Sequence, residues 1–493
     1  MGRRQKLGFF GGLALFVLML WLPAPEGLSQ AGWEAAATGA LMASWWISEA
    51  IPIPVTALVP VVAFPLLGVV SVADAASPYA NPLIFLFLGG FVIAVAMQKW
   101  ELHRRIALNI VSMVGVKPHA ILIGFMLSAA FLSMWVSNTA TALMMLPIGL
   151  SVLELADRQA PGGRSESNFA LVLMLIIAYA CNIGGMGTII GTPPNALLAG
   201  YMLENYGVEI GFARWMSVGL PLVAVSLPLM YLLLTRVIYP IRLEVLPGGG
   251  ELIRSQLEEI GDMNRAEMRV AAVFAGTAAL WVFRPLLEDL LPGLTDAGIA
   301  MGAAVLLFIL PAGVGESGSG GRQPLLSWKD TNMIPWGVLI LFGGGLSLAA
   351  AISSTGLAEW IGQGVKVLDA WPLLLLVGGV VVTIVFLTEL TSNTATTAAF
   401  LPIMGSVAVG IGQNPLLLVV PVALAASSAF MLPVATPPNA IVYGSERISI
   451  PQMSRAGLWL NLLLIVLITL LAFTLLTLLL GVQLDVLPDW AGG

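Results

Sequence analysis

The stretch SNTATALMMLPI at residues 137–148 lies in an otherwise apolar part of the chain. It returns at residues 392–403 as SNTATTAAFLPI, with eight of twelve positions identical. A polar Ser-Asn-Thr triplet is unfavourable in apolar surroundings, because its polar groups lose water and must find other partners there. Two copies of such a feature indicate that the triplet has the same purpose in two places.

The composition is that of an all-α polytopic membrane protein. The chain has 493 residues, of which 58% are hydrophobic and only 10% are charged, and its apolar runs are long. One cysteine and two histidines exclude a disulfide framework and a His-rich catalytic metal centre. Nucleic-acid binding is not expected, because the chain has no basic patch, and neither is an organic cofactor. Residues 7–23 are expected to be a first transmembrane helix, since the run is long for a cleaved signal peptide.

Two further motifs accompany the triplet in both places. A glycine-containing apolar segment precedes it at residues 82–96 and 335–351, and a Pro-Pro turn follows it in GTPPNA (191–196) and ATPPNA (435–440). Each Pro-Pro pair removes backbone donors and predicts a long helix broken into two halves. The repeated order of motifs is typical of a transporter built from two homologous halves.

The segments at residues 119–156 and 371–412 are expected to be hairpins that return to the side from which they enter. With a cytoplasmic N-terminus, 18 of the 21 Lys and Arg residues then lie inside, and only Arg214, Arg284 and Lys366 lie outside. The two hairpins open to opposite sides, so the repeats are inverted and the C-terminus is outside. If each segment instead crossed the membrane twice, the chain would again return to its own side and the distribution of charges would be the same. Re-entrant hairpins are preferred, because nothing would favour the same triplet twice in a loop that faces solvent.

This reading predicts about 11 transmembrane helices in addition to the two re-entrant hairpins. The expected organisation is N-terminal scaffold helices at 1–75; a first repeat at 76–240 with a hairpin at 118–156 and a broken helix at 168–203; a cytoplasmic linker at 241–266; scaffold helices at 267–312; a cytoplasmic loop at 313–331; a second repeat at 332–446 with a hairpin at 370–412 and a broken helix at 415–445; and a C-terminal helix at 455–482.

The tip of such a hairpin suits both a cation and an anion. The first arm ends there with free carbonyl groups, and the second arm begins there with free amide groups. An Asn side chain between them can ligate a cation through its oxygen and donate to an anion through its nitrogen. Capping of a helix end is the simpler explanation for one copy, but two copies in inverted halves favour a binding site.

Two acidic residues lie in the apolar segments and are candidate proton carriers. Glu389 stands three residues before the second triplet, and Glu49 lies in the segment WWISEAIPIPV. For Glu389, the preferred interpretation is that its carboxylate organises the neighbouring loop.

Over nearly its whole length the chain resembles the divalent anion/sodium symporter family. The similarity is carried by the doubled triplet and by two segments, WWISEAIPIPVTALVPVVAFPLLGV (45–69) and ASSAFMLPVATPPNAIV (426–442). The resemblance implies a homodimer of the bacterial inner membrane, in which a transport domain moves as an elevator against a scaffold. It also implies one sodium site at each triplet.

The resemblance also implies which residues form the sites. The sodium ligands would be Ser133, Ser137, Asn138 and the backbone near Gly191 in the first half, and Thr388, Thr391, Asn393 and the backbone near Ala435 in the second. The anion would lie between Asn138–Thr139 and Asn393–Thr394, closed by Thr192–Pro193 and Thr436–Pro437.

The expected function is sodium-coupled symport of C4-dicarboxylates such as succinate, malate and fumarate. Citrate or sulfate as substrate, and sodium-independent exchange or proton coupling, remain alternatives. An intramembrane hydrolase using Ser137 or Ser392 is disfavoured, because no His or Lys stands within several residues of either serine to act as a base. An anion channel would not need paired sets of cation ligands.

Overall fold

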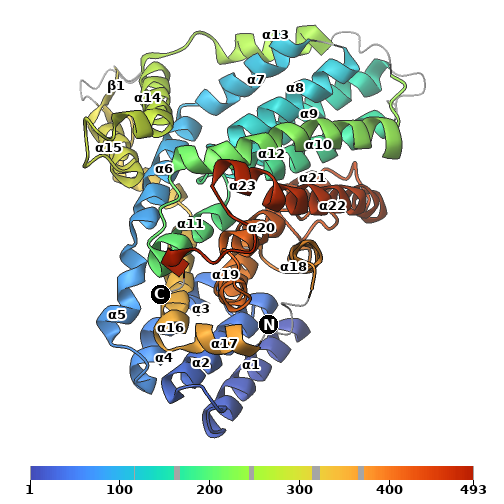
Figure 1. Ribbon diagram of the computed structural model, residues 1–493. Coiled ribbons are helices and arrows are strands. Elements are labelled where there is room, and N and C mark those ends of the chain that lie inside the picture. The colour runs from blue at the N-terminus through green and yellow to red at the C-terminus, as the bar shows by residue number, and fades with distance from the viewer. Residues whose placement is uncertain are drawn as a thin grey trace.

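The computed structural model is dominated by helices (Figure 1). It describes residues 2–115, 117–159, 167–243, 249–313, 323–364 and 371–491. Parts of the predicted linker (244–248) and loop (314–322) lie outside the described residues, as do Arg164, Arg322 and Lys366, which entered the charge count.

The first group of motifs occupies seven consecutive helices. Local sequence explains several of their ends: Asn81 caps α6 by accepting a hydrogen bond from the N–H of Leu83 at 3.0 Å, and Pro82 takes the first helical position. The seven are α6 (Pro82–Lys99), α7 (Leu102–Val114), α8 (Pro118–Ser133), α9 (Asn138–Gln159), α10 (Ser167–Gly185), α11 (Pro193–Tyr206) and α12 (Phe212–Leu232).

The second group of motifs gives helices in the same order. In both groups the Pro-Pro pair starts a new helix after an unwound segment, residues 186–192 in the first and 427–436 in the second. The helices are α16 (Trp336–Ser354), α17 (Leu357–Gly364), α18 (Leu373–Thr388), α19 (Asn393–Gly410), α20 (Leu416–Ala426), α21 (Pro437–Tyr443) and α22 (Ile450–Phe473).

Shorter elements precede, separate and follow the two groups. The apolar run at residues 54–72 forms two short helices with an interruption at residues 57–58. The remaining elements are α1 (Arg3–Trp21), α2 (Gln30–Ser48), α3 (Ile53–Thr56), α4 (Val59–Leu67), α5 (Val72–Ala76), η1 (Ser77–Ala80), η2 (Leu233–Ile238), α13 (Gly249–Ile260), α14 (Arg265–Leu287), α15 (Asp296–Ile309), the antiparallel strands β1 (Pro311–Gly313) and β2 (Gln323–Pro324), η3 (Trp328–Met333), α23 (Leu475–Leu479) and η5 (Asp489–Ala491).

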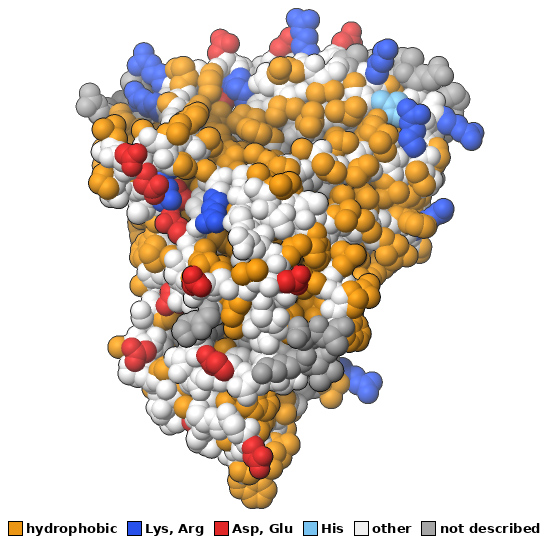
Figure 2. Space-filling view, viewed as in Figure 1, with side chains coloured by type: hydrophobic (Ala, Val, Ile, Leu, Met, Phe, Trp, Pro, Cys, Tyr) orange, Lys and Arg blue, Asp and Glu red, His pale blue; other side chains and the backbone are white. Residues whose placement is uncertain are grey.

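Several helical stretches are suited to a membrane. Within the described residues, seven are long and apolar enough to cross one, and five more are apolar but shorter. Figure 2 shows apolar side chains over much of the visible surface, with many Lys and Arg side chains gathered along its upper edge. The chain is therefore an integral membrane protein. The seven stretches are Val72–Lys99, Asn138–Asp157, Asn168–Gly185, Phe212–Ile238, Arg265–Leu287, Trp336–Ser354 and Ile450–Leu479.

The glycine runs allow helices to approach closely. A Cβ on Gly89 of α6 would lie 2.6 Å from the backbone of Ala300 in α15. A Cβ on Gly344 of α16 would collide with the backbone of Ala57. Larger residues would push these helices apart, as expected for glycines at helix contacts in membranes.

The two groups of helices pack against each other through reciprocal contacts between corresponding helices. Helix α9 of the first group packs on α21 of the second, and α19 of the second packs on α11 of the first. Helix α10 is the most enclosed of the long helices, because 94% of the stretch Asn168–Gly185 is buried. It packs against α8 and α9 of the first hairpin and against α21, which follows the second unwound segment.

Candidate functional site: the hairpin tips and the unwound segments

The tip of the first hairpin is residues 134–137, between the end of α8 and the start of α9. The hydroxyl of Ser133 donates to the side-chain oxygen of Asn138. The Ser137 hydroxyl accepts a hydrogen bond from the N–H of Ala140 at 3.3 Å and so caps α9. A carbonyl-rich helix end thus faces an amide-rich helix start across one short turn.

The second tip repeats this bonding. The Thr388 hydroxyl lies 2.7 Å from the side-chain oxygen of Asn393 and 2.9 Å from the carbonyl oxygen of Ala426. The Ser392 hydroxyl accepts from the N–H of Ala395 at 3.5 Å. The sequence repeat is therefore also a repeat of hydrogen bonds, in which a hydroxyl at the end of one arm meets the Asn that begins the other.

The first unwound segment lies against the first tip. A Cβ on Gly185 would be 2.8 Å from the side-chain oxygen of Asn138 and 2.9 Å from the carbonyl oxygen of Gly191. The Thr188 hydroxyl accepts from the N–H of Gly191 at 3.0 Å and donates to the carbonyl oxygen of Met134 in the tip. Three of the four predicted ligands of the first sodium site, Ser133, Asn138 and Gly191, are thus neighbours.

The predicted ligands of the second site are less evenly arranged. Thr388 and Asn393 are in contact, whereas the Thr391 hydroxyl bonds to the Thr396 hydroxyl at 2.6 Å and to the carbonyl oxygen of Leu387 at 2.9 Å. Ala435 is buried in the second unwound segment, where its N–H donates to the carbonyl oxygen of Leu432 at 3.2 Å.

Glu389 joins the second tip to the second unwound segment. Its carboxylate accepts from the N–H groups of Phe430, Met431 and Leu432 at 2.7, 2.9 and 3.1 Å, and from the amide of Asn461 at 2.7 Å. A carboxylate engaged by four donors matches the loop-organising role. Glu49, in contrast, is exposed at the end of α2 in a left-handed conformation with φ of 50°.

Two asparagines of the TPPN motifs were not among the predicted site residues. The Asn195 amide donates to the carbonyl oxygen of Thr188 at 2.8 Å, and the Asn439 amide donates to that of Leu432 at 3.1 Å. Both side chains are fully buried, and neither side-chain oxygen has a hydrogen-bond partner among the residues that the structure describes. Each amide holds the preceding unwound segment in place; the repetition of TPPN is the sequence signal that points to this role.

A basic side chain also reaches the second tip. The Arg4 guanidinium donates to the carbonyl oxygen of Leu390 at 2.8 Å and to that of Ile47. The sequence has no Lys or Arg near either triplet, so Arg4 reaches the second tip only through the fold. Arg4 and Leu390 are 386 residues apart, and no local pattern connects them.

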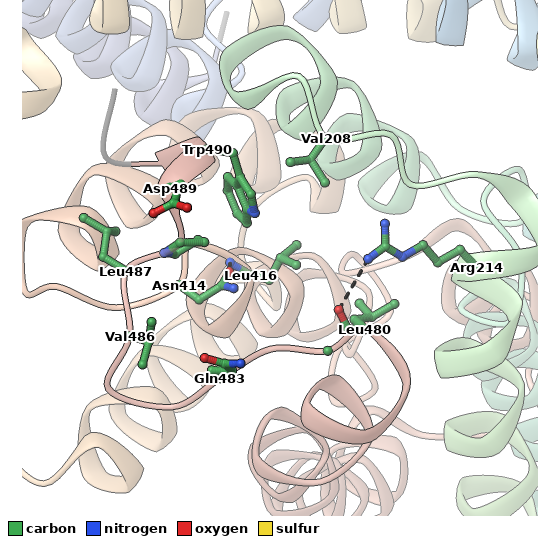
Figure 3. A pocket seen from close by; sticks show the side chains of 12 residues that line it. Val208, Arg214, Asn414, Leu416, Leu480, Gln483, Val486, Leu487, Asp489 and Trp490 are labelled. Atoms are coloured by element: carbon green, nitrogen blue, oxygen red, sulfur yellow. Dashed lines mark hydrogen bonds between the residues drawn. The ribbon is translucent and has the colours of Figure 1, made fainter.

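Two cavities lie away from the tips. One, of about 380 Å³, lies between the C-terminal tail and the loops before α12 and α20; Figure 3 shows Arg214 at its edge, donating to the carbonyl oxygen of Leu480 at 3.3 Å. The other, of about 320 Å³, is an apolar groove along α18 and α19 that includes Trp371 and Phe400. None of the predicted sodium or substrate residues lines either cavity.

Solved structures support the fold. The chain is similar to the YdaH transporter of Alcanivorax borkumensis (TM-score 0.53, 14% identity, covering 81% of this chain and 86% of that one). It is also similar to MtrF of Neisseria gonorrhoeae (TM-score 0.55, 10% identity, covering 96% of this chain and 94% of that one).

Relatives found by sequence indicate the family more specifically than the solved structures do. The chain is 43% identical to the sodium-dependent dicarboxylate transporter SdcS of Staphylococcus saprophyticus, over 97% of this chain and 93% of that protein. It is 42% identical to SdcS of Staphylococcus aureus strain USA300, over 98% of this chain and 93% of that protein. The profile of the sodium:sulfate symporter transmembrane region matches residues 5–482. With a match of this extent, the chain belongs to the sodium:sulfate symporter family.

Proposed function

We propose that this protein imports C4-dicarboxylates such as succinate, malate and fumarate, driven by co-transported sodium. The observation that carries the proposal is the doubled tip, in which Ser133 bonds to Asn138 and Thr388 bonds to Asn393 in the same way. Relatives with 42–43% identity are named sodium-dependent dicarboxylate transporters, and the protein is a transporter rather than an enzyme.

The oxygen atoms at the tips suit sodium. Hard alkali cations prefer oxygen ligands, and the hydroxyl of Ser133, the side-chain oxygen of Asn138 and the carbonyl oxygen of Gly191 lie close together. The C-terminal end of α8 adds partial negative charge at the same place. We assign Ser137 to this site as well. The second site would use Thr388, Thr391, Asn393 and Ala435, with the end of α18 in the role of α8.

The anion would be held without a basic side chain. Amide groups at the starts of α9 and α19, together with the side chains of Thr139 and Thr394, would bind its carboxylates from two sides. The turns at Thr192–Pro193 and Thr436–Pro437 would close the site. Arg4 contacts carbonyl oxygens near the second tip, so it adds no direct ligand. Sodium would therefore supply most of the balancing charge, which makes tight sodium dependence the expected behaviour.

The transport mechanism would follow from two halves that have opposite orientations in the membrane. The repeated helix order and the reciprocal contacts of α9 with α21 and α11 with α19 support two related halves around one site. In this proposal the hairpins are re-entrant, the N-terminus is cytoplasmic and the C-terminus is outside. One domain carrying both tips moves as an elevator against the scaffold of a homodimer in the bacterial inner membrane.

The testing experiment is uptake of labelled succinate into proteoliposomes. An inward sodium gradient is compared with an equal potassium gradient, and protein-free vesicles serve as the blank. Uptake that requires sodium supports the proposal. Uptake that ignores sodium and rises with internal dicarboxylate would replace symport by exchange. Competition by citrate or sulfate is measured in the same assay, because the family is named for sulfate; stronger competition than by malate would change the assigned substrate.

A further inference from the structure

Helix α10 of the first half reaches the unwound segment of the second half. The amide nitrogen of Asn182 lies 3.0 Å from the hydroxyl oxygen of Thr436 and 3.5 Å from the carbonyl oxygen of Ala429. A carbonyl oxygen can only accept, so the nitrogen of the Asn182 amide, not its oxygen, faces this segment. One turn earlier, the Tyr179 hydroxyl donates to the carbonyl oxygen of Phe430 at 2.8 Å.

These contacts decide where the hydrogen of the Thr436 hydroxyl points. The Thr436 oxygen accepts from Asn182 and also from the N–H of Asn439 at 3.4 Å. A hydroxyl has two acceptor positions and one donor, so both acceptor positions are occupied. Among the described residues, no protein acceptor receives the Thr436 hydrogen. The hydroxyl is therefore fixed as a donor that lacks a partner within the protein.

The equivalent threonine of the first half is not held in this way. In the part of the chain that the structure describes, no side chain bonds to the Thr192 hydroxyl. The two TPPN motifs lie 244 residues apart, so the counterpart of Asn182 in the second half is residue 426. This residue is Ala426, which has no side-chain donor. The two TPPN turns therefore differ: the Thr436 hydroxyl is oriented by a side chain of the opposite half, and among the described residues the Thr192 hydroxyl is not.

We propose that Asn182 is a positioning residue that aims the Thr436 hydroxyl at one carboxylate of the transported anion. This inference rests on the proposed function, because it requires a dicarboxylate bound at the tips. Asn182 touches no substrate itself; it raises the affinity for the anion by fixing a donor in advance. Binding is then stronger at the Thr436 end of the site than at the Thr192 end.

The test is a double-mutant cycle on succinate uptake. Asn182→Ala should raise the KM for succinate about 10-fold, the effect of weakening one hydrogen bond to a charged group. The maximal rate and the sodium concentration for half-maximal uptake should stay unchanged. Thr436→Val should raise KM further, and adding Asn182→Ala to it should change nothing more, because the hydroxyl that Asn182 orients is gone.

Thr192→Val is the matched control for the cycle. Its effect on KM should add to that of Asn182→Ala, since the Asn182 amide donates to Ala429 and Thr436 and, within the described part of the chain, not to Thr192. Melting temperature and size-exclusion profile are recorded for every variant. If Asn182→Ala fails to fold, Asn182→Ser, which is too short to reach Thr436, takes its place. If Thr436→Val does not transport, the cycle is read from succinate-induced thermal shifts in sodium.

The outcomes separate the inference from the function it rests on. An unchanged KM in Asn182→Ala would overturn the positioning role while leaving sodium-driven uptake intact. The role would also be overturned if the effects of Asn182→Ala and Thr436→Val on KM added as fully as those of Asn182→Ala and Thr192→Val. A loss of melting temperature with no change of KM would also overturn it, because Asn182 would then be purely structural. Absence of sodium-driven uptake in the wild type would instead refute the proposed function, and the inference with it.

Discussion

The Thr388 hydroxyl lies 2.7 Å from the side-chain oxygen of Asn393, and Ser133 makes the corresponding hydrogen bond to Asn138 in the other half. Each pair joins the end of one hairpin arm to the beginning of the next. In the proposed mechanism the same Asn serves a cation with its oxygen and an anion with its nitrogen, so it links the binding of the two.

Removing either Asn should therefore remove uptake. Asn138→Ala and Asn393→Ala should each lower sodium-driven succinate uptake by at least about 100-fold, because each loses two contacts with charged species. The measurement is initial-rate uptake in proteoliposomes. Asn109→Ala serves as a control, since its amide donates to the carbonyl oxygen of Arg105 on an exposed face of α7, away from both tips. Normal transport by either tip variant would refute the shared-Asn arrangement.

Gly185 should be required for sodium affinity at the first site. A Cβ there would crowd the Asn138 oxygen and the Gly191 carbonyl oxygen, at 2.8 and 2.9 Å. Gly185→Ala should raise the sodium concentration for half-maximal uptake about 10-fold, as expected for overpacking of a close contact. Gly276→Ala is the matched control, because a Cβ at Gly276 meets nothing within 4 Å. Equal sodium dependence in both variants would exclude the predicted crowding.

Glu389 should act as a structural acceptor and not as a proton carrier. Glu389→Gln keeps the shape but loses acceptor capacity towards Phe430, Met431 and Leu432. Uptake should fall about 10-fold while remaining driven by sodium, and an inward proton gradient should not replace sodium in either protein. If a proton gradient drives uptake in the wild type but not in Glu389→Gln, the result would support proton coupling through Glu389 instead.

Replacing sodium by potassium should lower thermal stability. A cation that binds only the folded protein stabilises it by about 2.7 kcal/mol when its concentration is 100 times its Kd. The detergent-solubilised protein should therefore melt at a higher apparent temperature in sodium than in potassium at equal ionic strength. Asn138→Ala should reduce this difference, while Asn109→Ala should leave it unchanged. An identical melting temperature in both salts would argue against resident sodium sites.

Much of the site is encoded locally. The helices break at the two Pro-Pro pairs, and each hairpin turns at its Ser-Asn-Thr triplet, because proline and capping residues act on the backbone within a few positions. The repeated order of these signals predicts the repeated order of helices. The grouping of Ser133 with Asn138 and of Thr388 with Asn393 came instead from the resemblance to the divalent anion/sodium symporter family, and the structure brings each pair into contact.

The tertiary structure decided which distant residues complete the site. The contact of Arg4 with Leu390, the four donors around Glu389 and the bond from Asn182 to Thr436 join elements that are far apart in the chain. Alone, the sequence determined the helices, their breaks and the doubled tips. These cross-chain contacts required the packed molecule, because they depend on how whole helices lie against one another and not on the preference of any short segment.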